Sequence, residues 1–350
     1  YGRSSLWGVR MWSVNTWLIA ICVGVYVIDG FLPQRWVGMQ TEALIEPEQL
    51  TTIDPSLLIF DSQVQVTVQD GRGRPTFGVR KVYVNGATGP VEVARQRLQN
   101  MKFIESFMHF STALTFQRPL QVFEFWRFIG FQFLHVSLTH LLFNLLPLYF
   151  FGSMVERYLG SKRYLAFYLL CGIFGALMYL LLNLGGFIAG SIFQQNIAIP
   201  GLLFNSTHTP LVGASAGVFG ILMAGAFLAP RTTVLLFFIL PIQLRTLAYA
   251  LVAIALFMVV RGGYNAGGEA GHLGGALAGF YFIRHPHHLH GFFDIVGRID
   301  PTSHHYRGSS RRASKQIQID RILEKINARG LHSLTNKEKR ILRESSEEKA

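Results

Sequence analysis

Residues 213–217 read Gly-Ala-Ser-Ala-Gly, and they open an apolar segment that runs to residue 229. Two other apolar segments also start with polar side chains. Residues 140–144 read His-Leu-Leu-Phe-Asn, and residues 271–275 read Gly-His-Leu-Gly-Gly. Polar groups are costly at membrane depth, so in membrane-spanning segments these residues would indicate a functional site.

The composition supports a membrane location for these segments. Of 350 residues, 50% are hydrophobic and only 15% are charged, against about 25% charged in a soluble domain. The apolar content excludes intrinsic disorder. The two cysteines, Cys22 and Cys171, lie in apolar runs, which excludes a disulfide scaffold and indicates small buried side chains.

We therefore predict an all-α polytopic membrane protein with six transmembrane helices, since a span needs about 20 mostly apolar residues. The first segment follows Arg3 and Arg10, as a signal peptide would, but no small-residue cleavage site follows it, and an uncleaved helix is expected. The six segments are residues 14–32, 137–155, 164–187, 213–229, 246–260 and 270–283.

Basic residues give the expected orientation. They follow the second segment (Arg157, Lys162, Arg163) and flank the connection to the fifth (Arg231, Arg245). Another 14 of the 32 Lys and Arg lie between Arg284 and the end. The positive-inside rule then places both termini in the cytoplasm, with Arg261 as an exception, and we expect a bacterial plasma membrane. The net charge of +12 is assigned to an anionic leaflet and not to nucleic acid.

Four regions are expected along the chain: residues 1–32 with the first helix, a long extracytoplasmic insertion at 33–120, a core at 121–285, and a basic cytosolic tail at 286–350. Alternating valines predict a β-hairpin between residues 64–68 and 79–84, and residues 91–110 are expected to form an amphipathic helix. The stretch 232–244, interrupted by Pro241, is expected to lie at the membrane interface or to start the fifth span.

The tail is expected to hold a helical hairpin, with one helix around Ile319–Ile326 and a capping box formed by Thr335 and Glu338. Four histidines precede it. Metal binding there is weighed against a solvated turn, and the turn is preferred because no Cys or carboxylate has ligand spacing. We expect neither metal nor cofactor. The histidines are His285, His287, His288 and His290.

The polar residues of the second, fourth and sixth segments share a depth, because each lies near the N-terminal end of a helix that runs in the same direction. Ser215 is the candidate nucleophile and His272 its general base. His140 and Asn144 lie on one helical face, where they can donate hydrogen bonds to an oxyanion. His135 is expected to link helices.

Small residues support an approach of the fourth and sixth helices. Gly213 and Gly217 are four apart, as are Gly271, Gly275 and Gly279, and such faces let membrane helices pack closely. Phe219 follows Ser215 by one turn, where its ring can stack on the imidazole of His272.

These motifs together resemble those of the rhomboid intramembrane serine proteases. Trp126-Arg127, the His140 and Asn144 pair, the Ser215 motif and the His272 motif occur in family order between residue 12 and about 285. The resemblance implies a six-helix fold and a Ser215–His272 dyad without a third acid. It also implies an oxyanion role for His140 and Asn144, and a loop shaped by Trp126 and Arg127. The tyrosine common in bacterial members is Phe219 here.

The expected function is cleavage of transmembrane protein substrates near the outer membrane face, with residues 262–268 and the fifth helix as a lid. Three alternatives remain beside it: a catalytically inactive relative that binds membrane clients, a transporter with proton-relaying histidines, and an α/β-hydrolase. The last is disfavoured because Glu269 is the only acid between Ala216 and Gly271. The oligomeric state stays open.

Overall fold

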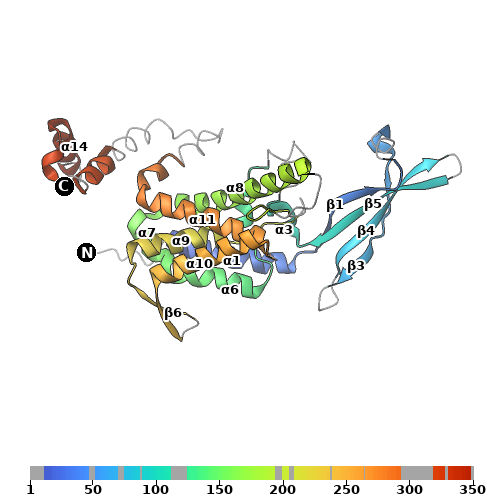
Figure 1. The fold of residues 1–350 in the computed structure, drawn as a ribbon, viewed down its shortest axis with the longest axis horizontal. Coiled ribbons are helices and arrows are strands. Elements are labelled where there is room, and N and C mark those ends of the chain that lie inside the picture. The colour runs from blue at the N-terminus through green and yellow to red at the C-terminus, as the bar shows by residue number, and fades with distance from the viewer. Residues whose placement is uncertain are drawn as a thin grey trace, which may run out of the picture.

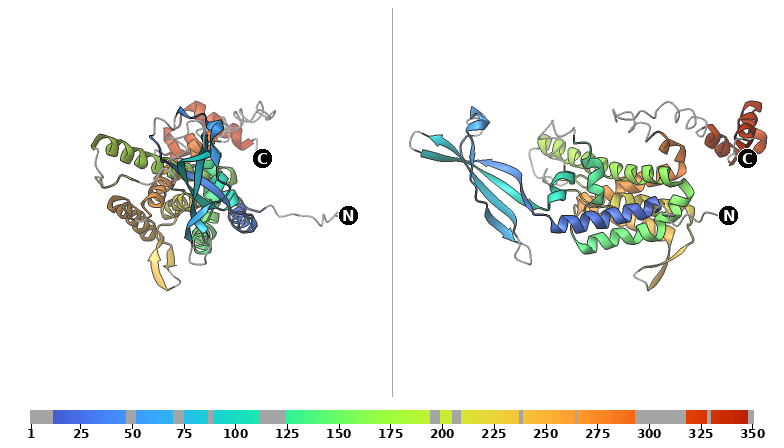
Figure 2. Two further views of the ribbon diagram at one scale, coloured as in Figure 1. Left: turned by 90° about the vertical axis from the view of Figure 1, so that its right-hand side faces the viewer. Right: turned by 180° about the vertical axis from the view of Figure 1, so that it is seen from behind.

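The computed structural model describes residues 12–46, 52–69, 75–86, 89–111, 124–193, 199–204, 209–236, 239–263, 265–292, 318–327 and 330–347. A bundle of helices forms the centre, and a twisted β-sheet projects from one of its ends (Figure 1). Seen from behind, the sheet again extends beyond the end of the bundle (Figure 2, right), and in the end-on view it lies in front of the helices (Figure 2, left).

All six apolar segments are helical, as predicted. The second is interrupted after Pro147, where a π-helical turn (η4, Leu148–Gly152) continues the rod, because proline removes one backbone donor. The helices are α1 (Val14–Phe31), α6 (Leu138–Pro147) with α7 (Ser153–Leu159), α8 (Ser161–Phe193), α9 (Ser215–Leu228), α10 (Leu244–Arg261) and α11 (Ala266–Arg284).

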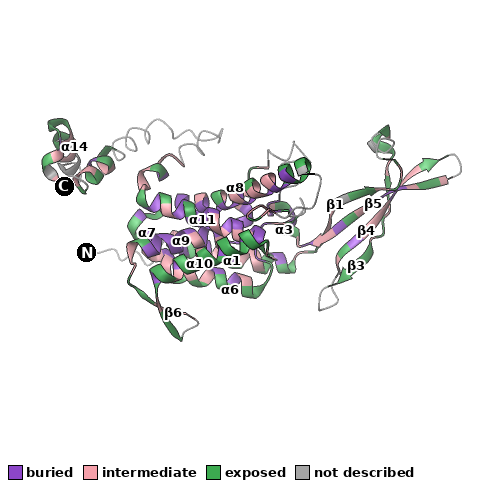
Figure 3. Cartoon of the chain, viewed as in Figure 1, coloured by how far each residue is buried: buried purple, intermediate pink, exposed green. Residues whose placement is uncertain are grey.

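Four of the described helical rods are long and apolar enough to cross a membrane: Val14–Phe31, Leu138–Leu159, Ser161–Ile192 and Leu244–Arg261. Exposed apolar side chains such as Ile28, Leu181 and Phe257 stand on their outer faces, while buried residues gather inside (Figure 3). The chain is a polytopic helical membrane protein. Helix α9 is shorter and α11 is not among the four, so the count of six spans stays a prediction.

Helix α9 lies in the middle of the bundle, with every residue from Ala216 to Ala226 buried except the half-buried Phe219. Helix α11 packs directly against it, because a side chain at Gly275 would meet the carbonyl of Ala216 and one at Gly279 would meet the backbone of Gly220. The predicted close approach of these two helices is confirmed. Gly217 instead packs against Tyr168 of α8.

The insertion is a β-structure, so the expectation of an all-α protein was wrong. Its five-stranded sheet has the order β1-β5-β4-β2, with β3 also paired to β4. The β3–β4 pairing, with Gln65 opposite Val79, confirms the predicted hairpin. The strands are β1 (Arg35–Ala43), β2 (Ile59–Phe60), β3 (Gln65–Gln69), β4 (Pro75–Gly86) and β5 (Gly89–Met101).

The helix expected over residues 91–110 was wrong for most of its length. Strand β5 occupies Gly89–Met101 and pairs with β1 on one side and β4 on the other, and only α3 (Phe103–Met108) is helical. Val93 and Leu98 are buried there. Pairing on both edges and cross-strand packing outweigh a helical spacing of apolar residues.

The connection between α9 and α10 is a short hairpin, so residues 232–243 do not start the fifth helix, and their location at the membrane interface stays a prediction. Strands β6 (Thr233–Leu236) and β7 (Leu240–Gln243) are antiparallel, with Leu235 opposite Pro241. A two-stranded ribbon has only edge strands, where proline's missing donor is tolerated.

Buried carboxylates fasten both ends of α1. Glu156 of α7 accepts hydrogen bonds from the backbone N–H groups of Val14 and Asn15, at 2.9 and 3.0 Å. Asp29 at the other end accepts from Ile104 and Glu105, which satisfies the free N–H groups at the start of α3. The first helix is therefore joined to the core at one end and to the insertion at the other.

The tail contains the predicted helices. Residues 318–327 form one, and α14 (Asn336–Glu347) follows the short turn η6 (Leu331–Ser333). Glu338 accepts from the backbone N–H of Thr335 at 2.7 Å, and the Glu338 N–H donates to the Thr335 hydroxyl at 3.3 Å, which confirms the capping box.

Candidate active site

Ser215 is the first residue of α9, and the loop before it is held by main-chain hydrogen bonds. Phe110 and Leu211 form an antiparallel bridge with N···O distances of 3.2 and 2.6 Å. The N–H of Gly213 donates to the carbonyl of Phe131 at 2.9 Å. Gly213 has φ +127°, a conformation that favours glycine. The serine is thus presented at a fixed helix N-terminus, where backbone donors are unpaired.

His140 lies against this loop. The backbone N–H of His140 donates to the hydroxyl of Ser137 at 3.1 Å, which caps the start of α6. A methyl carbon added to Gly213 would lie 2.8 Å from His140 Nε2 and 3.6 Å from Ser215 Oγ. The imidazole nitrogen and the hydroxyl therefore flank the same glycine, and a larger residue at position 213 would displace one of them.

Asn144 follows His140 by one turn of α6 and is 4% exposed. Its Nδ2 donates to the carbonyl of His140 at 2.9 Å. An amide nitrogen has two protons, so one remains for a ligand. The expected helix-linking hydrogen bond of His135 is not found among the described residues: both ring nitrogens are buried without a partner, and the ring lies edge-on to His140 with centroids 5.1 Å apart.

His272 of α11 is held on two sides. Its ring stacks on Phe219 of α9, with centroids 4.3 Å apart and planes at 10°. Its Nδ1 lies 2.9 Å from Glu269 Oε2. With Nδ1–H donated to the carboxylate, Nε2 carries the lone pair that a general base needs. The expected stacking is confirmed, and the structure adds an acid that the dyad did not include.

One cavity of about 1340 Å³ contains all four predicted site residues, Ser215, His272, His140 and Asn144, in its lining. Among the hydrogen bonds of the described residues, none joins Ser215 to His272; such bonds are often long in unliganded enzymes and tighten on binding. The structure thus brings the four residues together, and their catalytic roles remain predictions.

The core of the chain is similar in sequence to known proteins. The family model described as the Rhomboid domain matches residues 122–285. The mitochondrial RHOMBOID-like protein 12 of Arabidopsis thaliana is 31% identical over 144 residues, which cover 41% of each chain. The rhomboid protease GluP of Bacillus subtilis is 30% identical over 159 residues, which cover 45% of this chain and 25% of GluP.

Residues 122–285 form a domain of the rhomboid family. The human mitochondrial presenilin-associated rhomboid-like protein is also similar, with 28% identity over 160 residues. These matches span between a quarter and about two fifths of the relatives' lengths. A second model, a family of unknown function, matches residues 304–348 of the tail.

In this rhomboid, Trp126 and Arg127 join the insertion to the core. The buried guanidinium of Arg127 donates to the carbonyl oxygens of Ser106 and His109 at 3.4 and 3.0 Å, and pairs with Glu124. The indole of Trp126 donates to the carbonyl of Phe107 at 3.3 Å. Both residues therefore hold the C-terminal end of α3, and Phe110 just beyond it bonds to the serine loop.

Glu269 is the site residue that the sequence reasoning missed. Glu269 enters the sequence analysis only as a possible acid of an α/β-hydrolase. In that family the acid lies between the serine and the histidine in the chain. The signal that could have identified it is its position three residues before His272, because residues three apart on a helix share a face. Glu269 lies in the first turn of α11, where the helix dipole favours a negative charge.

Proposed function

We propose that this rhomboid is an intramembrane serine endopeptidase. The observation that carries the proposal is a single cavity lined by Ser215 at a helix N-terminus and by His272, whose ring is fixed between Phe219 and Glu269. A hydroxyl needs an adjacent base to become a nucleophile, and a ring held in one tautomer and one plane is suited to that task.

In the proposed reaction, His272 Nε2 takes the proton of Ser215 Oγ as the oxygen attacks the scissile carbonyl. The oxyanion that forms accepts hydrogen bonds from the Ser215 backbone N–H, His140 and Asn144. His272 then gives its proton to the leaving amine. Water completes the cycle by attacking the acyl-serine, with His272 again as the base. Glu269 keeps the imidazole oriented throughout.

The walls of the cavity support a transmembrane substrate. Phe143 and Leu146 of α6 face it from one side, and Leu247 and Leu251 of α10 from the other. A substrate helix in this apolar space must unwind locally at the cut, because its own hydrogen bonds shield the scissile amide. Helix-weakening glycine or proline near the cut therefore favours cleavage. Gly267 and Gly268 line the cavity too, but they belong to the first turn of α11, so the lid that we propose is α10 with the connection that follows it.

We also propose that cleavage occurs near the outer membrane face, with both termini in the cytoplasm. The α7–α8 junction, the β6–β7 hairpin and α14 lie at one end of the bundle, and the sheet at the other (Figure 1). The basic residues Arg157, Lys162 and Arg231 belong to that first end. This distribution supports a cytoplasmic first end under the positive-inside rule.

The test is cleavage of a model transmembrane substrate by the full chain in proteoliposomes. Ser215→Ala and His272→Ala should each lower kcat by about a thousandfold or more. A serine-directed phosphonate should label the wild type and leave Ser215→Ala unlabelled. Thermal unfolding of each variant checks that the fold is retained.

An active Ser215→Ala variant would overturn the proposal. A wild type that cuts none of several glycine- or proline-containing substrates, and that the phosphonate leaves unlabelled, would do so too. The inactive client-binding relative would then become the favoured function.

A further inference from the structure

Four histidines cluster where α11 ends. His285 terminates the helix, Pro286 starts the turn η5 (Pro286–Leu289), and His287, His288 and His290 follow. They lie beyond Arg284 at the end of the bundle, and none of them lines the cavity of the candidate active site. The proposed protease chemistry uses none of them.

The tail helix 318–327 brings carboxylates to this cluster. Asp320 and Glu324 are four residues apart and therefore lie on one helical face. Asp320 Oδ2 lies 2.8 Å from His290 Nε2, and Glu324 Oε2 lies 3.7 Å from His287 Nδ1. Asp320 also pairs with Arg163 of α8 at 3.5 Å, so this face of the helix lies against the end of the bundle. The sequence around the histidines has no carboxylate with ligand spacing. The carboxylates come from a helix that lies 30 or more positions further along the chain.

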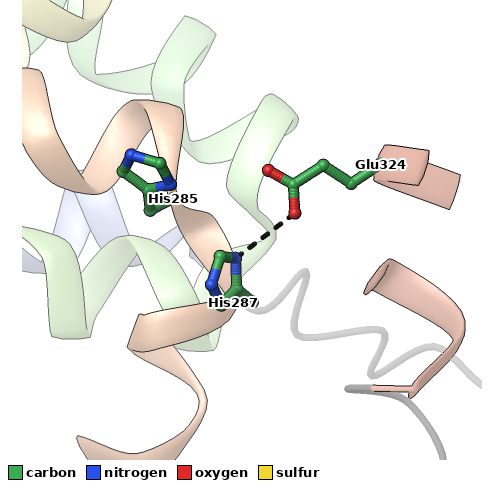
Figure 4. A group of neighbouring side chains, drawn as sticks. All are labelled: His285, His287 and Glu324. Atoms are coloured by element: carbon green, nitrogen blue, oxygen red, sulfur yellow. Dashed lines mark ion pairs between the residues drawn. The ribbon is translucent and has the colours of Figure 1, made fainter. Parts of the chain in front are cut away.

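Three of these side chains converge on one point. His285, His287 and Glu324 each offer a ligand atom, and the three atoms lie within 4.8 Å of one another. Figure 4 shows the two rings and the carboxylate turned toward a common space. Ligands of one tetrahedral zinc ion lie about 3.4 Å apart at bond lengths near 2.1 Å. Glu324 is half exposed, so its side chain can close the difference by a rotamer change.

We propose that His285, His287 and Glu324 form a binding site for a divalent transition-metal ion such as Zn²⁺. Two imidazoles and one carboxylate, with a water as fourth ligand, are a donor set that zinc accepts. His288 packs on His287 at 4.1 Å between ring centroids, and the hydroxyl of Tyr281 lies 2.8 Å from His288 Nδ1. His288, itself held by Tyr281, limits the orientation of the His287 ring on one side.

A metal ion here would join the tail to the end of α11, the helix that carries His272. The alternative is that the same residues form only ion pairs between imidazolium and carboxylate. The two alternatives differ in their need for a metal ion. Ion pairs form without one, whereas a metal site binds its ion tightly only when all three ligands are present. The proposal does not depend on protease activity.

The experiment measures Zn²⁺ binding to the full chain in detergent, purified with its affinity tag removed and dialysed against a chelator. Isothermal titration should give one equivalent per chain for the wild type. His287→Ala and Glu324→Gln should each lose that equivalent. His332→Ala, an exposed histidine of the tail outside the cluster, should keep it. Substitution with Co²⁺ should give visible absorption that disappears in the same two variants.

Two results would overturn the site. One is a wild type that takes up no Zn²⁺. The other is a Glu324→Gln variant that binds as tightly as the wild type, which would assign the metal to the histidines alone. Circular dichroism before titration confirms that each variant is folded.

Discussion

At the scale of single residues, Glu269 decides how well His272 is positioned. With the carboxylate 2.9 Å from Nδ1, Glu269→Gln keeps the shape but removes the charge that selects the tautomer and stabilises the imidazolium. We expect kcat to fall by about tenfold or more with KM unchanged, since general acid–base catalysis supplies about a hundredfold or more. Phosphonate labelling of Ser215 should slow in parallel.

Controls separate this positioning role from a structural one. Glu269→Asp should recover part of the rate, because the charge is retained on a shorter side chain. Glu92→Gln, which removes a partner of Lys81 and Arg95 in the sheet, should leave the rate unchanged. Equal kcat in wild type and Glu269→Gln would show that the contact is incidental.

At the scale of elements, the contact between α9 and α11 depends on glycine. A side chain at Gly275 would meet the carbonyl of Ala216, so Gly275→Val must push the helices apart and separate Ser215 from His272. Overpacking costs about 1–3 kcal/mol. We expect a lower Tm and loss of cleavage, measured on the same preparation.

Gly24 of α1 is the matched control, because nothing lies within 4 Å of a side chain added there. Gly24→Ala should raise stability by up to about 1 kcal/mol, as expected in a helix interior, and should leave cleavage intact. A Gly275→Val variant with wild-type Tm would contradict the packing described for the two helices.

The start of α14 should respond to acid. Hydrogen bonds from the backbone and hydroxyl of Thr335 and from Lys325 lower the pKa of Glu338 from 4.5 to about 2. The ionised cap therefore stabilises the helix above pH 4.5, and its contribution is lost as the pH falls toward 2. Backbone chemical shifts of α14 should move away from helical values in that interval. Glu338→Gln should abolish this pH dependence, whereas unchanged wild-type shifts would contradict it.

At the scale of the whole molecule, the proposed orientation places the sheet and the tail on opposite sides of the membrane. The native Cys22 and Cys171 are buried, so a membrane-impermeant thiol reagent reports introduced cysteines against a low background. Thr67→Cys in β3 and His332→Cys in the tail both lie at exposed positions. In vesicles whose outer surface is the extracytoplasmic one, only Thr67→Cys should react; labelling of His332→Cys alone would reverse the orientation.

The features that were predicted from the sequence are those encoded locally. Apolar runs located the helices, and polar residues inside those runs, such as Ser215 and His272, located the candidate site. The predictions failed where contacts with residues distant in the sequence determine the local structure. Residues 91–101 became a strand because β1 and β4 flank them. Glu324 reaches His287 only because a helix 37 positions along the chain packs on the bundle, and no local spacing encodes that contact.

The pairing of Arg35 with Met101 makes the insertion an exchangeable module. The chain leaves the core and returns to it through two neighbouring positions of an antiparallel ladder, about 5 Å apart. Everything between them could be replaced by a short turn without stretching the connections on either side. The anchoring contacts of α3 and Arg127 lie on the core side of that junction. A different domain could therefore be grafted there while the bundle and its serine stay as they are.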